Sequence, residues 1–488
     1  MPLSSLLQKA LTRVGGPFSE PTSLAIDSRK VQPGSLFVAI PGTQHEGSVF
    51  VGQALKSGAV GIIAPEGVGE KLWYHFKEDY PAVGFFETKN IRQMASQLAA
   101  AFYSGQPETI VGVTGTNGKT STVSFMRQIW AHLGYPAASL GTLGLVIEGS
   151  PLPPPTGTDG LNTPDAVTFH QLLQDLQRQG IDHLAFEASS HGIHQHRLDS
   201  VKLKAAVFTN FSQDHLDYHH TLDAYFEAKA RLLKEVMTPD TYAILNTEMV
   251  DYEKLVAICE TRSLKVASFG KKGNFLKLHS LVPTPQGQDV NLSIAGMPSP
   301  FLLPLVGEFQ AYNVMAAMSA VIACGADPSQ VVEACQTLKA VPGRLEQAAP
   351  GVYVDYAHTP DALSVALKAL RPHTQGKLWV VFGCGGDRDA LKRPVMGAIA
   401  ARLADCVIVT DDNPRYEDPA LIRKEILAKC PGAREIPDRY AAIQTALTHK
   451  QAEDVVLIAG KGHECYQLIQ DRALPFNDVE EVRRVGQS

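Results

Sequence analysis

The chain has 488 residues, of which 44% are hydrophobic and 19% are charged, a composition typical of globular proteins that excludes a disordered chain or a fibre. At roughly 100–200 residues per domain, this length predicts about three domains. There are 44 lysines and arginines against 50 aspartates and glutamates, giving a formal net charge of -6. This balance argues against a nucleic-acid-binding surface, which requires a surplus or a stripe of positive charge.

Three further features predict a cytoplasmic protein. The longest apolar runs, such as Leu378–Phe382 and Val455–Ala459, have the length of strands and are far too short to span a membrane. The N-terminal residues lack the basic head and apolar core of a signal peptide. The 7 cysteines lie between Cys259 and Cys465 without a C-x-x-C pair, which argues against a disulfide framework or a structural zinc site. A reducing compartment is therefore expected.

Strand-like and helical patterns alternate along the whole chain, which predicts the α/β fold class. In the first part of the chain, three short apolar runs precede a helix at Ile91–Tyr103, and a new strand at Thr109–Val113 begins after the polar break at Ser104-Gly105. The first domain boundary is predicted at this break. The three runs are Ser35–Ile40, Ala59–Ala64 and Ala82–Glu87.

The second boundary is predicted near Val341–Gly343, after a helix at Gln330–Lys339, so that the domains are 1–106, 107–340 and 341–488. Two polar stretches interrupt the middle domain. Ser150–Pro164 is expected to form an irregular surface loop, and Thr284–Asp289 is expected to form a hairpin excursion. Beyond the second boundary, strands alternate with helices as in a parallel α/β domain. These strands are Val352–Asp355, Leu378–Gly383, Cys406–Thr410 and Val455–Ala459.

Residues Ile110–Ser121 (IVGVTGTNGKTS) combine a β-rich run, a glycine-rich turn and the start of a helix. Backbone N–H groups in such a turn close around phosphate oxygens, and the helix N-terminus adds positive potential. The Lys119 ammonium can reach the β- and γ-phosphates of ATP, and the Thr120 hydroxyl can bind Mg²⁺. The strict P-loop spacing is absent because Val113 replaces its first glycine, so an ordinary glycine-rich turn is the alternative. The predicted ATP-binding residues are Gly115, Thr116, Asn117, Gly118, Lys119, Thr120 and Ser121.

The segment TGTNGKT at Thr114–Thr120 resembles the phosphate loop of the Mur ligase superfamily, ATP-dependent amide-forming enzymes that include the folylpolyglutamate synthetases. The resemblance extends over essentially the whole chain. It implies a UDP-precursor-binding α/β domain, a central domain with a P-loop-type ATPase sheet, and a Rossmann-like C-terminal domain. It also implies ATP as co-substrate and two Mg²⁺ ions. A monomer is expected, although the sequence does not determine the oligomeric state.

A lysine stands on the apolar face of the helix predicted at Leu222–Lys234 (LDAYFEAKARLLK). Lys229 lies four residues after Tyr225 and three before Leu232, so it points with the apolar set. Two interpretations are open. In the first, the aliphatic stem of Lys229 packs while its ammonium reaches water; in the second, its amine is desolvated and reactive. In Mur ligases a lysine in this context is carbamylated by carbon dioxide and the carbamate binds the second Mg²⁺. The resemblance therefore implies N6-carboxylysine at Lys229.

The strand-like run Ile181–Phe186 ends in the motif EASSHG at residues 187–192. A carboxylate and an imidazole just past a buried strand suit Mg²⁺ coordination near the phosphate loop, although a capped turn explains the same residues. The resemblance to the family motif E-x-SSHG implies that Glu187 and His191 are metal ligands. With Lys119 and Lys229 they form the predicted catalytic set.

The residues that contact the UDP-linked precursor are assigned by the resemblance alone. Arg197 has in addition a planar guanidinium that suits phosphate or carboxylate. Residues Thr209–His219 match another block of the family. Within it, Asp214 and His215 either line the ATP site or belong to a solvated loop. The precursor-binding residues implied are Ile26, Ser28, Thr43, Gln44, His45, Asn162, Thr163, Ser189, Gln195 and Arg197.

Three more ATP-binding residues are implied further along the chain. The segment GEFQAYN resembles the family block GxFNxxN, with Gln310 where an asparagine is usual. This departure leaves open whether Gln310 contacts the nucleotide, whereas Asn313 matches a nucleotide-contacting position of the family. Arg344 in GRLE and Asp355 in VDYAHTP match positions that touch phosphate and ribose.

Three strands of the C-terminal domain end in polar, glycine-rich segments, GCGGDRD, DDNPR and GKGHE. Because the carboxyl ends of parallel strands share one edge of a sheet, these segments should converge; ordinary solvated loops are the alternative. GKGHE fits a second phosphate loop poorly, since no Ser or Thr follows its lysine. Two arginines can clamp carboxylates, and Glu464 can hold an ammonium group. The predicted amino-acid-binding residues are Arg388, Asp412, Asn413, Pro414, Arg415, Gly460 and Glu464.

Within the resembled family, DNPR is the signature of enzymes that add meso-diaminopimelate, and enzymes that add L-lysine lack its arginine. Diaminopimelate carries a distal carboxylate that lysine does not have. When lysine binds, Arg415 is left uncompensated, a penalty on the order of several kcal/mol. The DNPR segment therefore predicts a strong preference for meso-diaminopimelate.

Taken together, the residues and the resemblance predict an ATP-dependent amide ligase of peptidoglycan biosynthesis. Its substrates would be ATP, meso-diaminopimelate and UDP-N-acetylmuramoyl-L-alanyl-D-glutamate, whose D-glutamate carboxylate is first converted to an acyl phosphate. The L-lysine-adding form and a folylpolyglutamate-type ligase are alternatives, although the N-terminal domain and DNPR have no role in the latter. A P-loop ATPase switch is an alternative of a different class.

Overall fold

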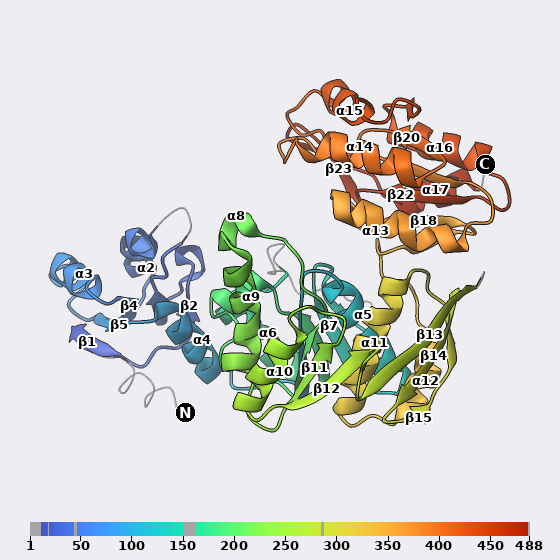
Figure 1. Cartoon of the computed structure of the whole chain (residues 1–488). Coiled ribbons are helices and arrows are strands. Elements are labelled where there is room, and N and C mark those ends of the chain that lie inside the picture. Colours follow the sequence, from blue (N-terminus) through green and yellow to red (C-terminus); the bar gives the residue numbers. More distant parts are fainter. Residues whose placement is uncertain (1–10, 18, 43–45, 150–161, 285–286, 487–488) are drawn as a thin grey trace. The chain divides into compact units, whose positions relative to one another are not determined.

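The computed structural model describes residues 11–17, 19–42, 46–149, 162–284 and 287–486 (Figure 1). The chain forms two compact units, one comprising Met1–Asn274 with Ala316–Asp327 and the other Phe275–Met315 with Pro328–Ser488. Strands and helices alternate in both units and the strands form several sheets, which confirms the α/β fold class. No described helix is both long and apolar enough to cross a membrane.

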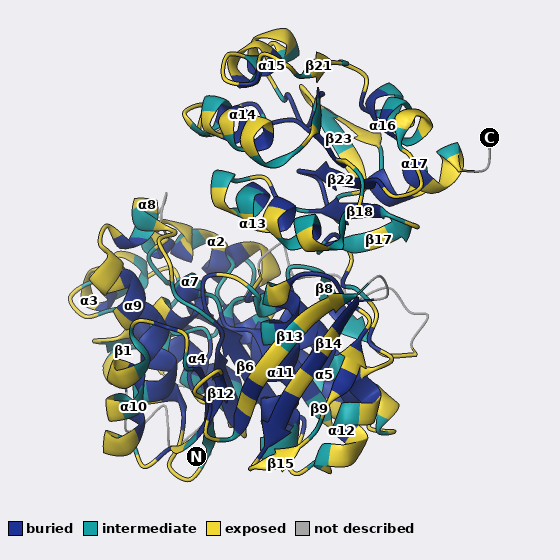
Figure 2. Cartoon of the chain, turned by 45° about the vertical axis from the view of Figure 1, so that its right-hand side comes forward, coloured by how far each residue is buried: buried dark blue, intermediate teal, exposed yellow. Residues whose placement is uncertain are grey.

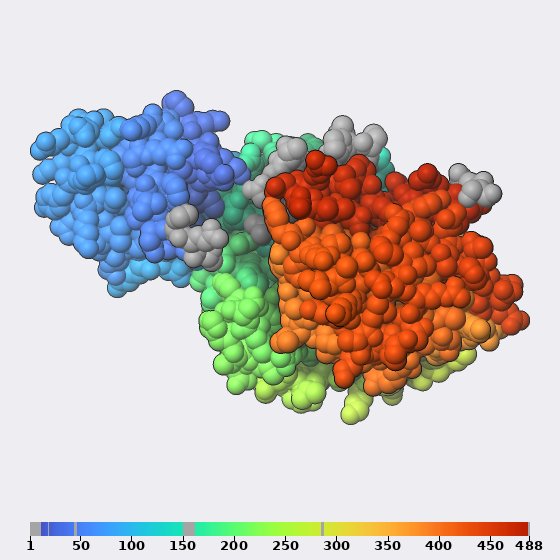
Figure 3. All heavy atoms as spheres, turned by 90° about the horizontal axis from the view of Figure 1, so that it is seen from above, coloured from blue at the N-terminus to red at the C-terminus, as the bar shows by residue number. Residues whose placement is uncertain are grey.

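The N-terminal residues of the first unit, coloured blue in the space-filling view (Figure 3), form a mostly parallel sheet with helices packed on it. The three strands and the helix expected from the sequence are confirmed, and Asn90 caps that helix by accepting a hydrogen bond from Gln93 N. The strand order is β1 (Thr12–Gly15), β5 (Gly84–Thr88), β4 (Gly61–Pro65), β3 (Ser35–Val38) and β2 (Ser23–Ala25), with β1 antiparallel. The helices are η1 (Ser28–Lys30), η2 (Gly47–Phe50), α2 (Val51–Lys56), α3 (Gly69–Phe76) and α4 (Ile91–Phe102).

The described residues of the first unit contribute seven strands to an 11-stranded sheet, and the phosphate-loop strand stands in the middle of these seven, buried on both faces (Figure 2). All neighbours are parallel except β8, which is antiparallel to β7. The order is β12 (Lys265–Gly270), β11 (Tyr242–Asn246), β10 (Ala205–Phe208), β6 (Thr109–Thr114), β9 (His183–Glu187), β7 (Ala137–Gly141) and β8 (Gly144–Ile147). The helices are α5 (Lys119–His132), α6 (Ala166–Arg178), α7 (Ser190–His194), α8 (Leu216–His219), α9 (Leu222–Arg231) and α10 (Tyr252–Thr261).

Two predictions in this part of the chain need correction or fall outside the structure. The helix predicted at Leu222–Lys234 is α-helical only as far as Arg231 and continues as a π-helical turn, η3, at Leu232–Val236. Most of the loop predicted at Ser150–Pro164 lies outside the described residues.

The second unit begins with the predicted hairpin, formed by β13 (Leu276–Thr284) and β14 (Gly287–Ile294). The helix predicted at Gln330–Lys339 is wrong at its end, because α12 spans Pro328–Cys335. The Thr337 hydroxyl and N–H both donate to the Ala334 carbonyl, which closes a tight turn instead of another helical one. The remaining elements here are β15 (Met297–Pro298), β16 (Phe301–Leu303) and α11 (Glu308–Ala323), whose last residues belong to the first unit.

The C-terminal sheet is parallel from β18 to β21 and has helices on both faces. Alternate residues of β19 pack into two separate cores, Leu378, Val380 and Phe382 into one and Trp379 and Val381 into the other. The order is β17 (Glu346–Ala349), β18 (Val352–Asp355), β22 (Val455–Ala459), β19 (Leu378–Phe382), β20 (Cys406–Val409) and β21 (Arg434–Glu435), with β17 antiparallel. The other elements are α13 (Pro360–Leu370), η4 (Arg371–His373), α14 (Lys392–Leu403), α15 (Pro419–Leu427), α16 (Arg439–His449), β23 (Tyr466–Ile469), β24 (Arg472–Pro475) and α17 (Asp478–Val485).

Candidate active site

The phosphate loop connects β6 to α5 and requires glycine at two places. Gly118 has a φ of +84°, and Gly115 has a φ of +141°, both in the left-handed half of conformational space. A Cβ on Gly115 would lie 2.0 Å from the Thr209 hydroxyl. Lys119 folds back over the loop, its Nζ donating to the Gly115 carbonyl at 2.9 Å and to the Thr116 carbonyl at 2.8 Å.

The end of the neighbouring strand β10 braces this loop. The Thr209 hydroxyl donates to the Asn117 carbonyl at 2.7 Å, and Asn117 N donates to Asn210 Oδ1 at 2.8 Å. Thr116 is held in the same way, because its hydroxyl accepts from Ser212 N at 3.0 Å. The sequence analysis named Asp214 and His215 in the Thr209–His219 block and missed these bracing residues. They could have been found from their place at the end of a strand, because the parallel sheet puts that end beside the phosphate loop.

Glu187, at the end of β9, is the carboxylate of the site and is only 1% exposed. Its Oε1 accepts from the Thr120 hydroxyl at 2.9 Å and from Thr142 N at 2.8 Å. A Cβ on Gly141 would lie 2.2 Å from the same oxygen. The carboxylate and the hydroxyl predicted to share a metal ion are thus adjacent, and Thr142 adds a second hydroxyl that the sequence analysis missed. An all-oxygen donor set beside a phosphate loop fits Mg²⁺, which usually takes one or two carboxylates and completes its shell with water and phosphate.

His191, the other predicted metal ligand, lies in an aromatic cluster formed by α7 and the following block. Its ring centroid is 4.1 Å from that of Tyr218, 5.1 Å from His215 and 5.6 Å from His219. Burial and then the neighbouring His215 lower the pKa of His191, and burial with the surrounding histidines lowers the pKa of His219 to about 4. In the described part of the chain, no three His, Cys, Asp or Glu side chains form a group that could hold a metal ion, so His191 as a ligand stays a prediction.

Lys229 is buried, with 1% of its surface exposed, so the alternative in which its ammonium reaches water is wrong. Its Nζ donates to the Gly115 carbonyl of the phosphate loop at 2.8 Å and lies 4.5 Å from the centre of the Tyr225 ring. Burial holds the pKa of this amine well below its usual 10.5, and the nearby Lys119 ammonium lowers it further. The helix α9 therefore delivers a desolvated amine to the loop that is predicted to bind phosphate.

Four of the predicted precursor-binding residues form one hydrogen-bonded group behind Glu187. The Thr163 hydroxyl donates to the Glu187 carbonyl at 2.8 Å and lies 2.9 Å from the Ser189 hydroxyl. Arg197 donates to the Thr163 carbonyl at 2.6 Å and to Gln195 Oε1 at 2.8 Å. Asn162 is exposed next to this group.

A cavity of about 790 Å³ lies between the N-terminal sheet and the start of α6, and two of the implied precursor-binding residues line it. Ile26 and Ser28 line it, and the Ser28 hydroxyl donates to Gln53 Oε1 at 2.9 Å. Three further residues implied to bind the precursor lie outside the described residues: Thr43, Gln44 and His45.

In the second unit, Gln310 links Asn313 to Arg344, and Asp355 bonds to the residue that follows Arg344. The Gln310 amide donates to the Arg344 carbonyl at 3.0 Å and accepts from Asn313 Nδ2 at 3.1 Å. Asp355 accepts from Leu345 N at 2.7 Å, and burial raises its pKa to about 6 although Arg344 opposes the shift. Both ends of the fully buried Gln310 amide are engaged, so this unusual residue ties Asn313 to Arg344, two of the three predicted nucleotide residues.

At the carboxyl edge of the C-terminal sheet, the three polar segments meet as expected. Asn413 Nδ2 donates to Glu464 Oε2 at 2.9 Å, and Arg415 donates from Nη1 to the Gly386 carbonyl at 2.8 Å. Close packing requires glycines here, since a Cβ on Gly460 would lie 2.5 Å from an Asp412 oxygen. Pro414 is buried within the segment, whereas Arg388 is exposed.

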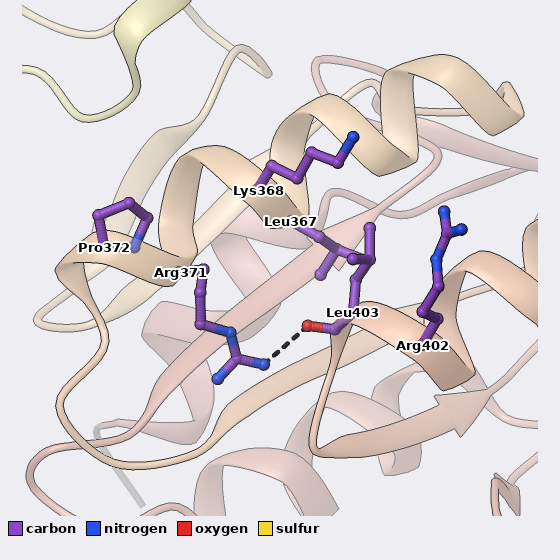
Figure 4. A pocket seen from close by; sticks show the side chains of 6 residues that line it. All are labelled: Leu367, Lys368, Arg371, Pro372, Arg402 and Leu403. Carbon is purple, nitrogen blue, oxygen red and sulfur yellow. Dashed lines mark hydrogen bonds between the residues drawn. The ribbon is translucent and has the colours of Figure 1, made fainter.

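A second cavity, of about 270 Å³, lies in the C-terminal domain between α13 and α14 and is lined by three cations (Figure 4). Arg371 donates to the Leu403 carbonyl at 2.7 Å and pairs with Asp405. Lys368 and Arg402 stand in the last turns of α13 and α14, where positive charge offsets the helix dipole. Stabilisation of the helix ends accounts for these cations.

Three family models match consecutive parts of the chain. The Mur ligase family catalytic domain matches residues 20–103, the Mur ligase middle domain residues 113–321, and the Mur ligase glutamate ligase domain residues 343–462.

Curated relatives and solved structures agree with these matches. The UDP-N-acetylmuramoyl-L-alanyl-D-glutamate–2,6-diaminopimelate ligases of Caulobacter vibrioides and Zymomonas mobilis are 48% and 46% identical, the first over 93% of both chains and the second over 93% of this chain and 92% of its own. A solved structure of an enzyme with this name is 33% identical, covers 95% of this chain and 94% of its own, and has a TM-score of 0.70. The MurF ligase of Thermotoga maritima in complex with ADP shares the fold at 19% identity over 95% of this chain and 96% of its own, with a TM-score of 0.63. This chain belongs to the Mur ligase family of ATP-dependent, amide-forming ligases.

Proposed function

We propose that this protein is a cytoplasmic, monomeric ligase that joins meso-diaminopimelate to UDP-N-acetylmuramoyl-L-alanyl-D-glutamate, using ATP, in peptidoglycan biosynthesis. The observation that carries the proposal is the cluster of Asn413, Arg415 and Glu464 at one sheet edge of a Mur ligase. The names of relatives that are 41–48% identical support the same acceptor.

The reaction has two steps in this proposal. A carboxylate oxygen of D-glutamate takes the γ-phosphoryl group of ATP, forming a P–O bond to the acyl group and releasing ADP. The amine of diaminopimelate then attacks the acyl carbon, the C–O bond to phosphate breaks, and the nitrogen loses a proton to give the amide and phosphate. Such transfers depend mainly on positioning and on electrostatic stabilisation, so no nucleophilic side chain is required.

The phosphate loop supplies the positioning for the first step. Its backbone N–H groups and the start of α5 bind phosphate oxygens, and the Lys119 ammonium exchanges its two carbonyl partners for the β- and γ-phosphates. The Thr120 hydroxyl and Glu187 carboxylate are the oxygen ligands available to a metal ion, with His191 as a further ligand and Lys229 as a carbamate. When bound, Mg²⁺ neutralises charge on the transferred phosphoryl group.

Lys229 has the properties that carbamylation requires. A neutral amine nitrogen attacks the carbon of CO₂, an N–C bond forms, one proton leaves to solvent, and the product is an anion. Burial favours the neutral amine, as the lowered pKa of Lys229 indicates. The product anion would face the Lys119 ammonium, the cation that lowers this pKa, so repulsion between two cations would become attraction.

The precursor is proposed to bind within the first unit. Its uridine end would occupy the cavity lined by Ile26 and Ser28, with Thr43, Gln44 and His45 completing the loop. The Thr163–Arg197 group, with Asn162, Ser189 and Gln195, would hold the other end beside Glu187.

Asn313, Arg344 and Asp355 are the residues of the second unit assigned to ATP. The amino acid is proposed to bind at the C-terminal sheet edge, through Arg388, Asp412, Asn413, Pro414, Arg415, Gly460 and Glu464.

One coupled assay tests the proposal. The expected result is ADP release that requires both the UDP-linked dipeptide and an amino acid, with diaminopimelate far better than L-lysine or L-glutamate. Comparable efficiency with lysine would favour the lysine-adding form, and use of a folate with glutamate the folylpolyglutamate type. ADP release without an acceptor would favour an ATPase switch. Light scattering of the purified protein checks the expected monomer.

A further inference from the structure

A second buried lysine, Lys461, lies at the amino-acid edge and is not among the residues that the proposed function uses. It lies two residues after the end of β22, in the GKGHE segment, and is 0% exposed. Lysine is almost never fully buried unless it is paired. Its Nζ donates to Asn413 Oδ1 at 2.9 Å and to Glu464 Oε2 at 3.2 Å, two groups assigned to the amino acid.

These bonds fix the orientation of the Asn413 amide. Its Oδ1 accepts from Lys461 Nζ and also from Leu468 N at 2.9 Å. An ammonium group has no acceptor, so the amide cannot turn its NH₂ toward Lys461. Asn413 Nδ2 therefore points to Glu464, which it meets at 2.9 Å.

The same bonds orient the Glu464 carboxylate. Lys461 and Asn413 both donate to Oε2, so one oxygen of the carboxylate is held by the protein from two sides. Glu464 itself is partly accessible, with 19% of its side chain exposed, whereas Lys461 is enclosed. A carboxylate held in this way is prepared to accept a ligand's ammonium group without first being reoriented.

We infer that Lys461 is a positioning residue for the amino-acid substrate, acting through Asn413 and Glu464 on an amino group of diaminopimelate. The inference rests on the proposed function. Lys461 does not contact the substrate in this account; it fixes the two side chains that do.

The test is steady-state kinetics of Lys461→Met in the full-length chain. Loss of hydrogen bonds to a charged group predicts a rise of about 10- to 100-fold in KM for diaminopimelate. The KM values for ATP and for the UDP-linked dipeptide are expected to stay within about twofold, because Lys461 bonds only to residues assigned to the amino acid. An unchanged KM for diaminopimelate, or a parallel rise for all three substrates, would overturn the inference.

Asp454→Asn is the matched control, because Asp454 stands at the opposite end of the same strand. It is buried and accepts from Lys377 N at 2.7 Å and from Trp379 Nε1 at 3.0 Å. This variant is expected to lower the melting temperature without raising the KM for diaminopimelate. If both variants raise that KM equally, Lys461 has only a structural role.

A substrate with one amine separates positioning from stability. With 2-aminopimelate, which lacks the second amino group, the effect of Lys461→Met is expected to shrink to about twofold, since Glu464 then has no ammonium to hold. A penalty as large as with diaminopimelate would contradict the inference. Should Lys461→Met fail to fold, Lys461→Gln, which keeps a donor, is tested in the same way. A wild-type enzyme that does not use diaminopimelate would refute the proposed function instead.

Discussion

Two buried lysines stand at the carboxyl edges of two different parallel sheets, and their neighbours give them different chemistry. Lys229, beside β6, donates to a backbone carbonyl and has the Lys119 ammonium nearby, so burial and repulsion both lower its pKa. Lys461, after β22, is paired with the Glu464 carboxylate and the Asn413 amide oxygen. The same residue type is therefore prepared for covalent modification in one sheet and for an ion pair in the other.

The comparison also separates two kinds of substrate recognition. The phosphate loop holds anions mainly with backbone groups, which requires glycine at positions such as Gly115 and Gly118. The C-terminal edge holds an amino acid with side chains, which requires Asn413, Arg415 and Glu464 to be fixed in orientation. Variants at the first edge should change phosphoryl transfer, and variants at the second should change acceptor choice.

The largest expected effect follows from removing the reactive lysine. Lys229→Ala is expected to lower kcat by about 1,000-fold, as for loss of a charge-stabilising group in a transfer reaction. Short carboxylates such as propionate should partly restore activity by supplying the missing anion, and mass spectrometry of the wild-type protein should find one added CO₂. Lys234→Ala, on the same helical segment but partly exposed, is the control. Absence of both the added mass and the rescue would show that Lys229 is not carbamylated.

The next effect concerns acceptor choice at the other edge. The wild-type kcat/KM for diaminopimelate is expected to exceed that for L-lysine by about 1,000-fold, and Arg415→Met to reduce this ratio by about 100-fold, because the unpaired arginine is what penalises lysine. The measurement is competition between the two amino acids in one reaction. Lys429→Met, at an exposed lysine of the same unit, should leave the ratio unchanged. An equal loss with both acceptors would contradict the role assigned to Arg415.

Stability against pH tests the environment of Lys229 directly. Its pKa is lowered in the folded state and is near 10.5 when unfolded, so between these values only the unfolded chain carries the proton. The wild-type free energy of unfolding should therefore rise with pH in this window, by up to about 1.4 kcal/mol per pH unit, and this rise should be missing in Lys229→Met. Denaturation in CO₂-free buffer measures it. Parallel curves for the two proteins would mean that this amine is not desolvated.

The smallest expected effect concerns the carboxylate beside the phosphate loop. In Gly141→Ala the new Cβ would lie 2.2 Å from Glu187 Oε1 and displace it from the Thr120 hydroxyl. The Mg²⁺ concentration for half-maximal activity is expected to rise about tenfold, the low end of what disturbing the partners of a metal ligand costs. Gly432→Ala is the control, since a Cβ there has open space. An unchanged Mg²⁺ requirement would argue against Glu187 as a ligand.

Much of the fold and part of the site follow from local sequence. The strands Val352–Asp355 and Val455–Ala459 were predicted at their observed bounds, because short apolar runs between polar turns are typical of strands buried on both faces. The phosphate loop was predicted from the order of a strand, a glycine-rich turn, Lys-Thr and a helix, and the apolar periodicity of α9 placed Lys229 on the buried face. Each of these features depends on residues close together in the chain.

Only the tertiary structure decided what those residues touch. Thr142 lies 45 residues from Glu187, Asn413 48 from Lys461, and Asn210 93 from Asn117. No local pattern encodes such pairs, since their partners are chosen by which strands become neighbours in a sheet. The unusual Gln310 is likewise explained by Arg344 and Asn313 at its two ends. The sequence by itself determined which side chains stand at the strand ends, and the order of the strands decided which of them meet, because hydrogen bonds and desolvation act over a few ångströms in space.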